Sequence, residues 1–96
     1  MKELTGFQRD LLYIIADQGQ PSGQDVRREL EEYYDKKVNH GRLYPNLDTL
    51  VEEDYVQKGE KDQRTNCYVI TTKGVNEIQT RDSWTDDIEI DDAAVV

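Results

Sequence analysis

The chain has 96 residues, of which 35% are apolar and 34% charged, so one small domain is expected. No apolar run reaches the roughly 20 residues of a membrane-spanning helix, and Met1–Thr5 lacks the apolar segment of a signal peptide. One cysteine and one histidine cannot form an internal disulfide or complete a zinc site without carboxylates or a partner chain. We therefore predict a cytoplasmic protein without a metal or other cofactor.

The net charge is −9, but the basic residues concentrate in two segments. Residues 36–47 contain three basic side chains and no acidic one, and residues 55–73 contain four basic and two acidic ones. The two segments together carry +5, and the rest of the chain carries −14. The acidic remainder fits a halophilic protein, since molar salt shortens the screening length to about 3 Å. It also fits an ordinary acidic protein with an acidic tail.

Apolar residues recur at helical spacing in the first part of the chain. The spacing predicts a helix that Thr5 caps and Gly19 ends. A second helix is predicted from the capping box of Ser22 and Asp25, followed by a turn over residues 35–38. The expected apolar residues of these two helices are Leu4, Phe7, Leu11, Leu12, Ile14, Ile15, Val26, Leu30, Tyr33 and Tyr34.

A third helix is predicted to start at Asn39, a favourable N-cap residue. Its buried stripe is expected to consist of Leu43, Leu47, Leu50 and Val51. Strands are predicted over residues 55–58 and 66–71, with a charged hairpin tip between them. A last helix is expected over residues 75–90, and residues 91–96 are predicted to be a disordered tail.

Three helices followed by a two-stranded hairpin and a helix form the order of a winged helix-turn-helix. The predicted fold class is therefore mainly α with a small β-hairpin. Residues 1–74 are expected to form the DNA-binding domain and residues 75–90 a dimerisation arm. This order places both basic segments on one face, at the start of the third helix and at the hairpin tip.

Two motifs resemble those of the PadR-type transcriptional regulators, and of their haloarchaeal members in particular. Residues 41–47 have the pattern Gly-x-Leu-Tyr-Pro-x-Leu, and residues 64–74 have Arg-x-x-x-Tyr-x-Ile-Thr-x-x-Gly. The opening residues 8–13 are similar as well. The resemblance implies a homodimeric, DNA-binding regulator and a role in the oxidant response. Many members carry a long C-terminal helical domain, whereas only residues 75–90 are available here.

The third helix is expected to present its N-terminal half to the major groove, with Arg42 as the contact to a guanine edge. Gly41 allows the backbone to approach the duplex closely, while Asp48 and Glu52 are expected to point away from the phosphates. The residues predicted to contact DNA are Ser22, Gln24, Lys36, Lys37, Asn39, His40, Gly41, Arg42, Tyr44, Pro45, Asn46, Thr49, Lys58, Lys61, Arg64, Thr65 and Lys73.

Two reading heads related by a two-fold axis would read a pseudo-palindromic operator. The predicted dimer interface consists of Leu4, Phe7, Trp84 and Ile88. For Trp84, packing within its own chain is the alternative. Inorganic cations that bridge carboxylates and phosphates are a further predicted partner at the DNA interface.

Two alternatives to these readings are left open. Cys67 is either a redox-sensitive thiol or, as we favour, a half-buried strand residue. The whole domain is either a DNA-binding regulator or a winged helix that binds another protein through its acidic surface. No catalytic set, phosphate-binding glycine loop or metal-ligand spacing is found, so an enzyme is not expected.

Overall fold

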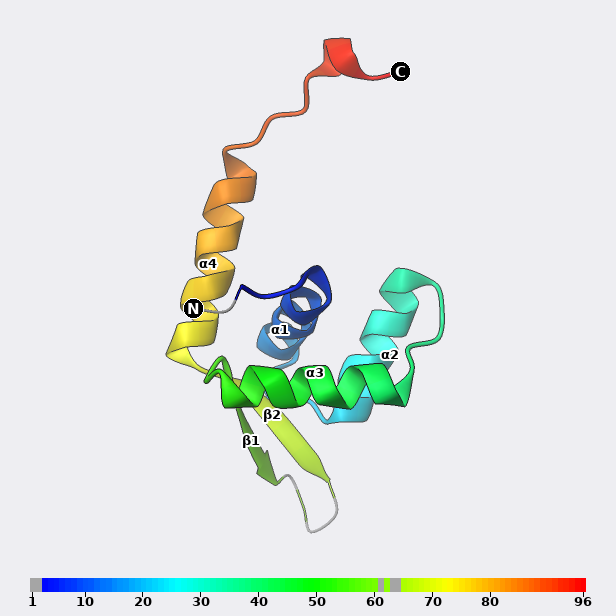
Figure 1. Ribbon diagram of the computed structural model, residues 1–96, viewed down its shortest axis with the longest axis vertical. Coiled ribbons are helices and arrows are strands. Elements are labelled where there is room, and N and C mark those ends of the chain that lie inside the picture. The colour runs from blue at the N-terminus through cyan, green and yellow to red at the C-terminus, as the bar shows by residue number, and fades with distance from the viewer. Residues whose placement is uncertain (1–2, 61, 63–64) are drawn as a thin grey trace.

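The computed structural model describes residues 3–60, 62 and 65–96 (Figure 1). Its elements follow the predicted order of a winged helix-turn-helix. They are α1 (Gly6–Gln18), α2 (Gly23–Tyr34), α3 (His40–Glu52), β1 (Val56–Glu60), β2 (Asn66–Ile70), α4 (Thr72–Asp86) and the short 3-10 helix η1 (Asp92–Ala94). No helix in the described part of the chain is long and apolar enough to cross a membrane.

Polar caps set the starts of the first three helices. Thr5 accepts a hydrogen bond from the third amide of α1 in a capping box. Ser22 and Asp25 form the predicted capping box of α2. The side chain of Asn39 accepts from the Gly41 amide at 2.7 Å, which starts α3. These side chains satisfy amides that have no partner within their own helix.

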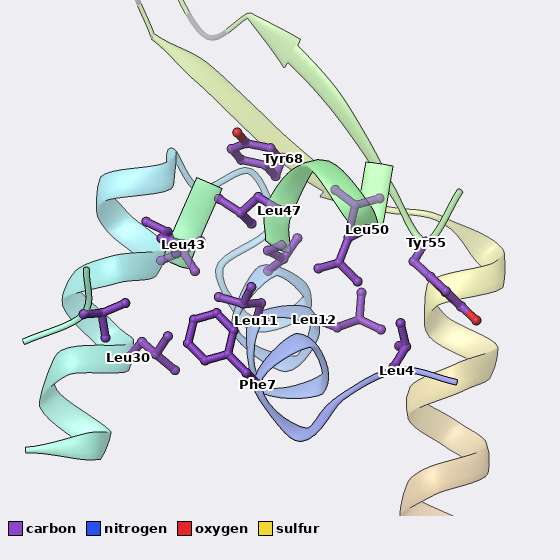
Figure 2. Packing of buried hydrophobic residues seen from close by; sticks show 14 residues of the cluster. Leu4, Phe7, Leu11, Leu12, Leu30, Leu43, Leu47, Leu50, Tyr55 and Tyr68 are labelled. Carbon is purple, nitrogen blue, oxygen red and sulfur yellow. The ribbon is translucent and has the colours of Figure 1, made fainter. Parts of the chain in front are cut away.

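A layer of leucines holds α3 on α1. Leu43, Leu47 and Leu50 of α3 are fully buried, and Figure 2 shows them facing Leu11 and Leu12 of α1. Burial of one leucine side chain is worth about 2 kcal/mol. Because the leucine side of α3 is held against α1, only the other sides of α3 can contact another molecule.

The second helix buries less of its apolar side than predicted. Val26 and Leu30 are fully buried, and Tyr34 is half-buried, with its hydroxyl donating to the Asp10 carboxylate at 2.5 Å. Tyr33 is 79% exposed, so its predicted burial was wrong. The ring lies 6.0 Å from the Tyr34 ring and lines a shallow hollow between α1 and α2.

The hairpin is joined to the start of α2 by its second strand. β1 and β2 are antiparallel, with Lys58 opposite Tyr68. The Tyr68 amide donates to the Pro21 carbonyl at 2.9 Å, and Ser22 forms an isolated bridge with Cys67. These backbone contacts fix the base of the wing beside the N-terminus of α2. Cys67 is buried there, which agrees with its reading as a strand residue.

Only the first part of α4 packs on the rest of the domain. The Tyr13 hydroxyl of α1 donates to the Asp82 carboxylate at 2.5 Å, and Ile78 packs against the core. Beyond this point α4 projects from the body and carries the C-terminal segment away from the wing (Figure 1). All residues from 82 onward are exposed. The predicted disorder of residues 91–96, three of which form η1, stays a prediction.

Candidate nucleic-acid interface

The two flanks of α3 face different neighbours. One flank faces α1, where the Gln8 side-chain amide donates to Asn46 at 3.0 Å. On the same flank the Arg42 guanidinium lies 3.9 Å from the centre of the Phe7 ring. This is the geometry of a cation–π contact. Arg42 thus lies against the domain itself in this conformation.

The opposite flank of α3 faces the N-terminus of α2 through Tyr44. The Tyr44 hydroxyl accepts a hydrogen bond from the side-chain amide of Gln24 at 3.1 Å, and the His40 ring packs 4.4 Å from the Tyr44 ring. A Cβ atom on Gly23 would come within 2.6 Å of the Tyr44 hydroxyl. Position 23 therefore requires glycine because of this close approach between α2 and α3.

A cleft of about 350 Å³ lies between the N-terminus of α2, the Tyr44 flank of α3 and the wing. We call it the wing cleft; it is lined by Ser22, Gly23, Gln24, Tyr44, Thr65, Asn66 and Tyr68. Four of these residues were predicted to contact DNA, and they come from segments up to 43 positions apart (Ser22 and Thr65). His40, Gly41 and Pro45 of α3 are exposed, and the His40 ring packs against Tyr44 at the wall of the cleft.

The comparison with known families covers most of the fold, from within α1 to within α4. Residues 11–80 match the model of the transcriptional regulator PadR-like family. The chain belongs to the PadR-like family. Its members are transcriptional regulators and not enzymes. No curated protein matches the chain.

Solved structures of the same fold include a close relative. The chain is 45% identical to RosR of H. salinarum, with a TM-score of 0.81, over 88% of this chain and 76% of that chain. F93 from STIV, a winged-helix DNA-binding protein, is 19% identical and has a TM-score of 0.72, over 88% and 91%. PadR of Bacillus subtilis in complex with operator DNA is 19% identical, with a TM-score of 0.71, over 96% and 53%. The last two show the fold alone.

Several predicted DNA contacts of this PadR-like chain are engaged inside the domain. The Asn46 side chain donates to the Arg42 carbonyl at 2.7 Å in addition to its bond from Gln8. The Thr49 hydroxyl donates to the Pro45 carbonyl at 3.1 Å. Asn46 thus bonds towards α1, and Thr49 bonds along α3 itself. Their part in DNA contact stays a prediction.

Lys73 has a structural partner at the C-terminal end of α3. Its ammonium group donates to the Glu53 carbonyl at 2.6 Å and lies 4.3 Å from the centre of the Tyr55 ring. A cation satisfies the last carbonyls of a helix and interacts favourably with the helix dipole. The side chain therefore joins α4 to α3 and is directed away from the N-terminal half of α3.

The remaining basic residues surround the interface. Lys36 and Lys37 are exposed on the turn before α3, and Lys58 is exposed on β1. In the antiparallel register Lys58 shares a sheet face with Tyr68, which lines the wing cleft. The predicted contacts Lys61 and Arg64 lie outside the described residues. The Asn39 side chain caps α3, and its oxygen is engaged by the Gly41 amide.

Sequence reasoning missed the place of two residues at the wing cleft, Asn66 and Tyr68. The signal was available, since alternate residues of a strand point to the same face. Burial, with a smaller effect of the Asp48 charge, raises the pKa of Tyr68 to about 12. That Asp48 points away from the phosphates stays a prediction.

The predicted dimer residues fall into two groups. Leu4 and Phe7 are buried in the core of their own chain, 5% and 8% exposed, so they do not form a surface for a partner. Trp84 and Ile88 are 57% and 53% exposed on the projecting end of α4 and the segment after it. Within its own chain, Trp84 contacts the Arg81 guanidinium at 5.1 Å from the ring centre.

The turn that orients α3 is held by a carboxylate, which makes its stability pH-dependent. The Glu31 carboxylate accepts from the Val38 amide at 2.7 Å and from Arg27 at 3.3 Å. The bond from Val38 lowers the pKa of Glu31. A carboxyl group with a lowered folded-state pKa stabilises the fold above its unfolded pKa, and this contribution is lost as pH falls through the folded pKa.

We expect Glu31→Gln to lower the free energy of unfolding at neutral pH, because a neutral amide accepts a weaker hydrogen bond from Val38. The difference from wild type should shrink as pH falls below about 4. Urea unfolding at a series of pH values measures both effects, with Glu32→Gln, an exposed neighbour, as the control. A difference from wild type that is the same at every pH would contradict this role for the Glu31 charge.

Proposed function

We propose that this PadR-like regulator binds a specific pseudo-palindromic operator as a homodimer. The observation that carries the proposal is the convergence of α3, the N-terminus of α2 and the wing on one polar cleft. A helix fits the major groove of B-DNA, and helix-turn-helix proteins present the N-terminal part of the second helix to the bases. His40, Gly41 and Pro45 are exposed in that part of α3.

Arg42 is proposed to read a guanine after leaving the Phe7 ring. Losing an exposed cation–π contact costs about 0.5–1 kcal/mol. A bidentate contact with a guanine edge contributes about 1–3 kcal/mol of discrimination. The exchange is therefore favourable at a matching base pair, and the contact with Phe7 keeps the side chain beside α3 in the free protein.

The exposed lysines are proposed to position the duplex rather than to read it. Lys36 and Lys37 precede α3, and Lys58 lies on the sheet face of Tyr68. Lysine contacts to phosphates are independent of base sequence. Lys61 and Arg64 are proposed to contribute in the same way. Inorganic cations that bridge carboxylates and phosphates at the DNA interface are a related proposal. A cytoplasmic location and a part in the oxidant response complete the proposal.

A winged helix that binds only proteins is the second candidate. It has no need to keep the start of α3 and the wing basic while the rest of the chain is acidic. The segregation of charge, +5 in residues 36–47 and 55–73 against −9 for the whole chain, favours DNA.

Base reading by α3 is tested by binding to a pool of genomic DNA fragments at several KCl concentrations. Wild type should retain a few fragments selectively, and Arg42→Ala should lower the affinity ratio of retained to random fragments by about tenfold. Arg42→Lys is the matched control: it keeps the charge but cannot form the bidentate contact, so it should lose discrimination too. Undiminished discrimination in both variants would contradict base reading by Arg42, and retention of no fragment at any salt would contradict the DNA-binding proposal.

The homodimer is tested by sedimentation velocity. One chain has a mass of 11.2 kDa, and wild type should sediment with twice that mass. Trp84→Ser should shift the protein towards the monomer, because the exposed indole is the largest apolar group on the projecting part of α4. Tyr33→Ser, which also removes an exposed aromatic ring, should leave the dimer intact. A wild-type monomer, or a Trp84→Ser dimer of undiminished stability, would contradict this interface.

A further inference from the structure

We propose that the wing cleft seats one phosphate group of the DNA backbone, and that the Tyr68 hydroxyl donates a hydrogen bond to it. This inference rests on the proposed function and adds to it a specific contact and a residue that was not predicted from the sequence. Three donors from three elements support it: the hydroxyls of Tyr68 and Tyr44 and the backbone amide of Gln24.

Tyr68 is the most unusual group in the cleft. The residue is only 1% exposed, yet it lines the wing cleft. Figure 2 shows its ring above Leu47, with the hydroxyl at the end turned away from the leucine layer. No described residue forms a hydrogen bond with this hydroxyl. The hydroxyl reaches the wall of the cleft, so a ligand could accept its hydrogen bond without displacing a partner within the domain.

The N-terminus of α2 supplies backbone donors on the opposite wall. α2 has 12 residues, and its Ser22 cap engages only the amide of Asp25. The bridge between Ser22 and Cys67 turns the Gly23 amide towards β2, whereas the Gln24 amide has no acceptor within the described residues. A first-turn amide and the helix dipole together favour an anion. Gly23 also lets α2 and α3 approach closely, since any side chain there would collide with Tyr44.

Tyr44 adds a second hydroxyl donor. Its oxygen accepts from the Gln24 side chain at 3.1 Å, so its own proton is left to donate into the cleft. The Tyr68 hydroxyl also keeps its proton at neutral pH, because burial raises the pKa of Tyr68 to about 12. The residues that carry the two tyrosine hydroxyls and the Gln24 amide therefore line the same cleft.

The charges around the cleft favour a phosphate that is delivered by the duplex over a free anion. None of the lining residues carries a charged side chain. The negative charge of Asp48 contributes to the raised pKa of Tyr68. The Asp25 carboxylate accepts from the Ser22 amide at 3.0 Å and from Arg28. A neutral site near two carboxylates binds free phosphate weakly. A duplex held by α3 presents its phosphate at a high effective concentration, which overcomes this weakness.

The test is the affinity of Tyr68→Phe for duplex DNA. We expect about tenfold weaker binding to both selected and random fragments, because a hydrogen bond to a phosphate carries no base information. The slope of affinity against salt should be unchanged, since no cation is removed. The ring is retained, so thermal unfolding confirms that the variant folds. Tyr33→Phe, a tyrosine on the exposed side of α2, should bind as wild type does.

A second arm replaces single phosphates of the duplex by neutral methylphosphonates. At one position the replacement should weaken wild-type binding but leave the binding of Tyr68→Phe nearly unchanged, because the two changes remove the same contact. Equal affinities of wild type and Tyr68→Phe, or additive effects at every position, would overturn the inference while leaving the proposed function intact. If the wild-type protein binds no DNA, both the proposed function and this inference are contradicted. If millimolar inorganic phosphate alone saturates amide shifts in the cleft, the site is for free phosphate and the DNA source is overturned.

Discussion

The backbone bond from the Tyr68 amide to the Pro21 carbonyl determines how the parts of this domain face one another. The bond acts together with the Ser22–Cys67 bridge and the buried side chains of Val56 and Tyr68, which pack the hairpin on the body. With this bond, β2 is held against the segment that leads into α2. The ring of the same residue is buried above Leu47 of α3 (Figure 2). One residue therefore brings three elements to one corner, and the wing cleft follows from that arrangement.

Local patterns predicted the elements well, because caps and periodicity act over a few residues. Thr5, Ser22 and Asn39 start their helices as expected, and Leu43, Leu47 and Leu50 form the buried face of α3. The orientation of the α3 flanks was not predictable in this way. It depends on contacts such as that between Gln8 and Asn46, which are 38 positions apart. Helical spacing identifies the residues on a flank but not the element that the flank meets.

Contacts between elements also engage residues that were predicted to contact a partner. Lys73 was interpreted as a DNA contact, which stays a prediction, and the Glu53 carbonyl lies within its reach because the start of α4 lies at the end of α3. Phe7 was expected at a dimer interface, but it fills the core beneath Arg42. Strand alternation in residues 66–68 could have placed Tyr68 beside Asn66. Strand alternation could not have predicted that the N-terminus of α2 also lines the wing cleft.

The distribution of charge explains how a chain of net charge −9 can still bind a polyanion. The donors that line the wing cleft are uncharged, and the exposed lysines lie outside the cleft. Acidic side chains such as Glu29 and Glu32 lie on α2, in a separate hollow on another side. Screening by salt weakens their repulsion of DNA beyond about one Debye length. Contacts at short range then decide the binding.

The central claim is that α3, the N-terminus of α2 and the wing form one DNA-binding face. Amide chemical-shift mapping of the isotope-labelled protein during titration with duplex DNA tests it most directly. The account predicts the largest changes in residues 22–24, 39–45 and 65–68, with little change around Tyr13 and Tyr33. Changes centred on the α1–α2 side, or none with DNA in excess, would contradict it.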